Sequence, residues 1–100
     1  MVEKEDILST LKKLKPIYEK EGLILKGLFG SYAKGEESKF SDIDIAYKLD
    51  YETFNNSYTG GFAKLLRIDS IKKDLEKIFH KKVDFVPDNN TNTVKDLIYV

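Results

Sequence analysis

The chain has 100 residues, of which 41% are hydrophobic and 34% charged, and this is the composition of a single globular domain rather than of a disordered segment. Its 17 basic and 17 acidic side chains cancel to a net charge of zero, which disfavours general binding to nucleic acids or anionic membrane surfaces. Because there is no cysteine and only one histidine, His80, a bound metal would have to be a hard cation held by oxygen ligands.

The first ten residues mix charged and apolar side chains where a secretory signal would need a continuous apolar stretch. No run of residues approaches the roughly 20 apolar residues of a membrane span. We therefore expect a cytoplasmic protein without a membrane partner, folded as one domain over residues 1–100.

Apolar residues recur at helical spacing from Asp6 to Tyr18 and predict an amphipathic helix. Pro16 lies inside this pattern, so we expect the helix to end or kink there, and Gly22 to stop whatever follows. Residues Leu23–Phe29 include five large apolar side chains and predict a buried strand that runs directly into Gly30.

The next segments are shorter. Ser31–Lys39 is polar and fits a short helix or a structured loop, whereas apolar and acidic residues alternate in Ser41–Leu49 and predict a second strand. Asp50–Gly61 is rich in Asn, Ser, Thr and Gly and predicts a loop, which we expect to be the most mobile segment.

A second long helix is predicted from about Phe62 to His80, and the Asp69-Ser70 pair could break it or cap a new one. A third strand follows at Lys81–Pro87, and Val94–Val100 fits a final short strand or helical turn. Together these elements predict an α/β (α+β) fold with a small mixed sheet of three to four strands and two long helices packed on one face.

Gly30-Ser31 is the first candidate functional feature, because it lies where a buried strand ends and a short helix begins. Unpaired backbone amides at such a junction suit phosphate oxygens, glycine allows close approach, and the serine hydroxyl adds a donor. Considered alone, an ordinary turn is the more frequent explanation of this pair.

Acidic residues within strands are the second feature. Asp42 and Asp44 are separated by one residue, so they point to the same face of a strand, and Asp84 takes the same place in the third strand. A solvated strand face is the alternative explanation. Asp is disfavoured in strands, however, and like charges on one face favour a cation between them. Three carboxylates on one face can hold two magnesium ions that bridge phosphates at Gly30-Ser31.

Two other phosphate-binding motifs are excluded. The spacing from Gly30 to Gly35 matches a P-loop, but Glu36 and Glu37 stand where that motif needs Lys and Ser or Thr. No G-x-G-x-x-G motif follows a strand, which removes the dinucleotide-binding interpretation. No aromatic residue stands out in the sequence as a platform for a nucleobase.

Gly30-Ser31, ten further residues and then Asp42-Ile43-Asp44 resemble the signature of the nucleotidyltransferase (DNA polymerase β-like) superfamily, and the short chain resembles its minimal members. The resemblance extends over nearly the whole chain, with VDFV as the strand of the third acid. It implies the nucleotidyltransferase fold and the transfer of AMP from ATP.

The resemblance also implies the residue roles. Asp42, Asp44 and Asp84 would be catalytic and would hold two Mg²⁺ ions, with Asp84 helping to deprotonate the acceptor hydroxyl. The nucleotide-binding residues would be Gly30, Ser31, Lys34 and Ser41. Many minimal members have arginine directly after Gly-Ser and again two residues later, whereas this chain has Tyr32 and Lys34.

Minimal nucleotidyltransferases are often encoded beside a small helical protein of the HEPN type, and such pairs resemble toxin–antitoxin systems. The resemblance therefore implies an antitoxin that adenylylates a hydroxyl, expected to be a tyrosine, of its HEPN-type toxin. Two alternatives remain: an antitoxin that only binds its partner, and an enzyme that transfers the nucleotide to a small molecule. The last would need a further acceptor-binding domain or a dimer.

Overall fold

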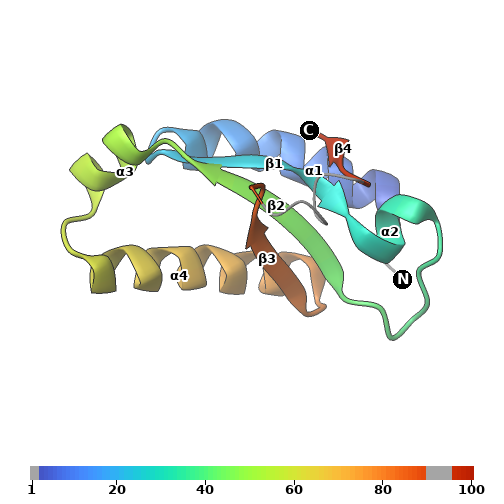
Figure 1. The fold of residues 1–100 in the computed structure, drawn as a ribbon. Coiled ribbons are helices and arrows are strands. Elements are labelled where there is room, and N and C mark those ends of the chain that lie inside the picture. Colours follow the sequence, from blue (N-terminus) through green and yellow to red (C-terminus); the bar gives the residue numbers. More distant parts are fainter. Residues whose placement is uncertain (1–2, 90–95) are drawn as a thin grey trace.

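The computed structural model describes residues 3–89 and 96–100 of the chain (Figure 1). The helices and strands follow in the order α1 (Lys4–Glu19), β1 (Leu23–Phe29), α2 (Gly30–Lys34), β2 (Ile43–Leu49), α3 (Tyr51–Ser57), α4 (Gly61–Phe79), β3 (Val83–Pro87) and β4 (Ile98–Tyr99). No helix in the described part of the chain combines the length and the apolarity that a bilayer crossing requires.

The four strands form one mixed sheet in the order β3-β2-β1-β4. β1 pairs antiparallel with both β2 and β4, whereas β2 and β3 are parallel. A parallel pair needs a crossover connection, and the segment with α3 and α4 supplies it (Figure 1). The predicted mixed sheet is therefore confirmed, with β2, the strand that follows Asp42, at its interior.

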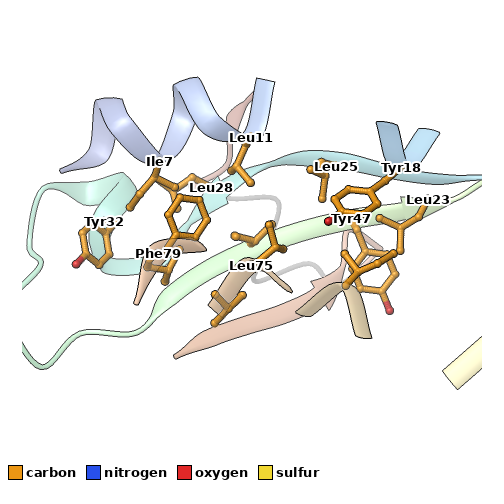
Figure 2. Close-up of a cluster of buried hydrophobic side chains, with 14 of the residues drawn as sticks. Ile7, Leu11, Tyr18, Leu23, Leu25, Leu28, Tyr32, Tyr47, Leu75 and Phe79 are labelled. Carbon is orange, nitrogen blue, oxygen red and sulfur yellow. The ribbon is translucent and has the colours of Figure 1, made fainter. Parts of the chain in front are cut away.

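Both long helices cover the same face of the sheet, as the sequence predicts. One buried cluster joins side chains of α1, of α4 and of the inward-facing positions of the strands (Figure 2). Arg67 of α4 also lies over the ring of Tyr18 of α1, 5.9 Å from its centroid. The opposite face of β2, which carries the alternate residues, is consequently left without a long helix.

The structure corrects two expectations, an end of the first helix at Pro16 and a loop over Asp50–Gly61. α1 does not end at Pro16 but continues to Glu19; Pro16 is exposed, so the carbonyl that its missing N–H leaves unpaired can face water. The segment predicted as a loop contains α3, which begins after Asp50. The Asp50 carboxylate accepts hydrogen bonds from the Thr53 N–H at 3.5 Å and the Thr53 hydroxyl at 3.0 Å, and the side chain of Phe54 is fully buried.

The second long helix is confirmed, and it has no break at Asp69-Ser70. Asp69 forms an ion pair with Lys73 one turn later at 2.9 Å, and the Ser70 hydroxyl accepts a hydrogen bond from Arg67 at 3.3 Å. The predicted third strand is confirmed as β3. Of the predicted final segment, β4 is a short strand, while residues 94 and 95 lie outside the described residues.

Arg67, the only arginine of the chain, connects α4 to the turn before β1. Its guanidinium donates two hydrogen bonds to the Glu21 carboxylate, at 2.9 and 2.7 Å, and the Tyr58 hydroxyl donates to the same carboxylate. The hydrogen bonds from Arg67 hold the pKa of Glu21 below its ordinary value. This half-buried network connects α4 and the segment between α3 and α4 to the turn before β1.

Ile43→Asp should unfold the protein, because Ile43 is fully buried in the interior strand and an aspartate there would bury a charge. We expect a loss of about 4 kcal/mol or more, which is comparable with the total stability of a small domain. Lys48→Asp is the control at an exposed position of the same strand and should cost about 1 kcal/mol or less. Urea denaturation measures both, and a stable Ile43→Asp protein would show that the two faces of β2 are assigned wrongly.

Candidate functional site

The three aspartates singled out by the sequence lie together at one end of the open sheet face. Asp44 pairs with Phe29 of β1 on one side and with Asp84 of β3 on the other, so the Asp44 and Asp84 carboxylates are neighbours on the same face. Asp42 precedes the first residue of β2 and comes two residues before Asp44. Asp42 and Asp84 are exposed, whereas Asp44 is half-buried.

The electrostatics of Asp44 reflect this arrangement. Burial, and then the negative charges of Asp84 and Asp42, raise the pKa of Asp44 from 3.8 to about 6. Each of the other two acids is thus near enough to disfavour the ionised form of Asp44. A cation bound among them would offset this repulsion, and aspartate oxygens are ligands that Mg²⁺ prefers.

Within residues 3–89 and 96–100, no three carboxylate or imidazole groups converge closely enough to form a ready-made metal site. Asp44 and Asp84 hold adjacent register positions on an open face. The donor chemistry therefore fits a hard divalent cation that takes only part of its ligands from the protein and the rest from water or phosphate oxygens.

Gly30 connects the phosphate-binding candidate to the acids. It is the first residue of α2 and has a φ of 72°, a conformation that glycine adopts without strain. A Cβ atom at this position would collide with the Asp44 carboxylate. The missing side chain thus lets that carboxylate lie directly against the turn from β1 into α2. Ser31 follows in the same turn and is partly exposed.

Lys34 and Ser41, the other predicted nucleotide-binding residues, lie outside the turn formed by Gly30 and Ser31. Lys34 is exposed at the end of α2 and forms an ion pair with Asp96 at 3.5 Å. The Ser41 hydroxyl accepts a hydrogen bond from the Ser38 N–H at 2.9 Å, so it orders the turn before Asp42. Ser41 directly precedes Asp42 in the chain, whereas Lys34 is the last residue of α2.

Tyr32 does not face the site. Its side chain is fully buried in the same core cluster as Ile7, Leu28 and Phe79 (Figure 2). Its hydroxyl finds no hydrogen-bond partner among residues 3–89 and 96–100. The residue that stands in place of the first arginine is therefore a core residue. With tyrosine instead of arginine at position 32, a basic group is missing, but the buried ring does not obstruct the surface beside Gly30 and Ser31.

A cleft of about 620 Å³ lies between the start of α1 and the end of α4, with Asp6, Lys39 and His80 in its lining. None of the three site aspartates lines it. The acids lie instead on the exposed part of the sheet face that carries Asp42, Asp44 and Asp84, which we call the shelf. It can be approached directly from solvent.

Comparison with known proteins places this chain in a family. Residues 12–99 match the family described as Polymerase beta, Nucleotidyltransferase. The chain belongs to this nucleotidyltransferase family, and it is a nucleotidyltransferase of the minimal type. The match includes Gly30-Ser31 and all three aspartates, so the residues gathered on the shelf lie within the family's own domain.

Similar proteins of Methanocaldococcus jannaschii bear the name of protein adenylyltransferases. One is 36% identical over 108 aligned positions, covering 93% of this chain and 100% of the relative. A second is 33% identical over 88 positions, covering 87% of this chain and 84% of the relative. The nucleotidyltransferase family and enzyme class predicted from the sequence are confirmed by these matches and by the family match.

Among solved structures, the chain is similar to one described as the crystal structure of a toxin–antitoxin with AMP-PNP. The TM-score is 0.53 and the sequence identity 26%, and the match covers 84% of this chain and 61% of the other. The predicted nucleotidyltransferase fold is confirmed. Because the match covers only 61% of the other chain, that chain contains parts without a counterpart in this protein's aligned residues.

Asp44→Asn should stabilise the protein above about pH 6 while leaving it nearly unchanged near pH 4. Because the pKa of Asp44 is raised to about 6 in the fold, the folded state binds a proton more tightly than the unfolded state. The ionised carboxylate consequently destabilises the fold as the pH rises from about 4 through about 6, and asparagine removes this loss.

Thermal melting from about pH 4 to about pH 8 measures the effect, with the variant melting a few degrees higher at the alkaline end. Asp88→Asn, on the turn after β3, is the control, because it makes the same change of side chain outside the group of three acids. Parallel melting curves of the wild type and Asp44→Asn at every pH would contradict the assigned electrostatics.

Proposed function

We propose that this protein is a Mg²⁺-dependent adenylyltransferase that moves AMP from ATP to a hydroxyl group of a HEPN-type toxin, a tyrosine hydroxyl in our hypothesis, and so acts as its antitoxin. The observation that carries the proposal is the cluster of Asp42, Asp44 and Asp84 on one open face, with Gly30 packed against the Asp44 carboxylate. Family membership and the named relatives support the reaction class.

In this proposal one group of residues binds the triphosphate of ATP and another holds the metal ions. Gly30 and Ser31 bind the triphosphate at the turn between β1 and α2, where the backbone can be approached closely. Lys34 and Ser41 complete the phosphate side from the end of α2 and from the turn before β2. The nucleotide then lies across the shelf with its α-phosphorus near the acids.

The acids serve the chemical step. Asp42, Asp44 and Asp84 would hold Mg²⁺, which when bound lowers the pKa of the acceptor hydroxyl and neutralises charge on the departing pyrophosphate. The acceptor oxygen forms a bond to the α-phosphorus as the bond to the pyrophosphate oxygen breaks. Asp84 would take the hydroxyl proton, and its exposure on the edge strand β3 supports this role.

A protein acceptor fits the open architecture better than a small molecule. The acids lie on an exposed shelf rather than in an enclosed pocket, so a partner would have to supply the walls around the acceptor. An apolar surface is available for such a partner on α4, where Phe62, Leu65 and Leu66 are 76%, 67% and 55% exposed at helical neighbour spacing. The similar toxin–antitoxin structure agrees with this preference.

The direct test is the intact mass of a co-expressed candidate HEPN-type partner after incubation with this protein, ATP and Mg²⁺. We expect a gain of one or more AMP units with the wild type and none with Asp42→Asn/Asp44→Asn. The double variant should still fold and bind the partner, because both side chains lie on the open face.

Omission of Mg²⁺ should also abolish the mass gain, and peptide mapping identifies the modified residue. A stable complex without any mass change would favour an antitoxin that acts by binding alone. A double variant that does not fold would contradict the assignment of these acids to an open site.

Leu65→Asp should weaken partner binding by about tenfold or more while leaving the protein folded, since Leu65 is exposed near the middle of the apolar surface. Ser9→Asp, which adds the same charge at an exposed position of α1, is the matched control and should bind normally. Calorimetric titration of the partner measures both variants. Equal affinities would exclude the α4 surface as the contact.

A further inference from the structure

The last strand brings an aromatic residue onto the face that carries the acids. Tyr99 of β4 pairs with Gly27 of β1, and Gly27 is two residues from Phe29, which pairs with Asp44. Residues paired across a sheet, and residues two apart in a strand, share a face. Tyr99 therefore points to the same side as Asp44 and Asp84, and it is 61% exposed.

The side chain of Lys26 lies over the Tyr99 ring. The register between β1 and β2 shifts between Leu25 and Gly27, so Lys26 is the extra residue of a β-bulge. Its ammonium group lies 5.6 Å from the centroid of the Tyr99 ring. A cation at this distance is attracted to the negative face of the ring and covers one side of it.

The segment that carries Tyr99 is anchored at several points. The Val100 N–H donates to the Lys26 carbonyl at 2.9 Å, and the Lys15 ammonium of α1 donates to the Val100 carbonyl at the same distance. Nearer the site, Asp96 is paired with Lys34 of α2. A side chain at Gly27 would collide with the Ile98 carbonyl, so glycine permits this pairing. The exposed ring is thus held in place by its surroundings.

We propose that Tyr99, together with Lys26, forms the nucleobase subsite of this enzyme, in which the base stacks on the Tyr99 ring. The inference rests on the proposed function, because it requires a nucleotide whose triphosphate lies at Gly30-Ser31. An exposed aromatic ring on an anchored strand is a stacking platform, and stacking accepts any base but favours the larger surface of a purine.

The position of the ring suits this role. β4 and β2 lie on opposite sides of β1, so Tyr99 is about 10 Å across the sheet from the line of Asp44. The turn that begins α2 directly follows β1 and lies between them. Triphosphate bound at this turn leaves the sugar and base free to extend toward β4. Asp84 lies on the same face but on β3, at the other edge of the sheet, so the acceptor can approach from that edge.

The test compares two probes, AMP-PNP and inorganic tripolyphosphate, each titrated with Mg²⁺ into the wild type, Tyr99→Ala and Tyr99→Phe. Loss of base stacking should weaken AMP-PNP binding to Tyr99→Ala roughly 5- to 100-fold. Tyr99→Phe keeps the ring and should bind within about twofold of the wild type. Tripolyphosphate has no base, so both variants should bind it like the wild type, whereas Ser31→Ala should weaken both probes.

Each contrary result points to one error. Equal AMP-PNP affinity of the wild type and Tyr99→Ala would overturn the subsite, as would loss of tripolyphosphate binding by Tyr99→Ala, which would mean that the ring only supports the fold. Weaker partner binding with unchanged AMP-PNP affinity would assign Tyr99 to the protein interface instead. A wild type that binds neither probe would overturn the proposed function itself.

Discussion

The contact between the Gly30 backbone and the Asp44 carboxylate is the constraint around which the site is arranged. It requires a residue without a side chain, at positive φ, where β1 passes into α2. It also requires an ionisable side chain at the second position of the interior strand β2. Because Asp44 is half-buried there and faces two other acids, its ionised form is disfavoured, and a cation bound among the acids would relieve this. The site therefore carries a local electrostatic cost that the rest of the fold must offset.

The core offsets this cost by packing only one side of the sheet. α1 and α4 bury the inward residues of β1, β2 and β3 in one cluster (Figure 2). Ile43 and Ile45, on either side of Asp44, belong to this cluster. The strand is thus fixed by its inward neighbours while its outward carboxylate stays accessible. In the same way, Arg67 of α4 is paired with Glu21, so the basic residue at the end of α2 is a lysine, Lys34.

Sequence reasoning found the elements with strong periodicity and the residues with unusual chemistry. The two long helices, the three main strands and the common face of Asp42 and Asp44 follow from spacings of 3.6 and 2 residues, which act locally. The polar composition of Asp50–Gly61 predicted a loop and therefore missed α3. The stability of α3 depends on the Asp50 cap and on the burial of Phe54 against distant parts of the chain. Pro16 likewise stays within a helix that tertiary packing holds together.

By itself the sequence determined the family, the class of reaction and the acids, because these depend on residue types at short, fixed separations. Only the tertiary structure decided which strands became neighbours, since the parallel pairing of β2 with β3 and the antiparallel pairing of β1 with β4 join residues far apart in the chain. Those pairings set Asp84 beside Asp44 and bring Tyr99 onto the open face, while packing of the core buries Tyr32. Register between strands is fixed by packing over the whole sheet, and no local pattern records it.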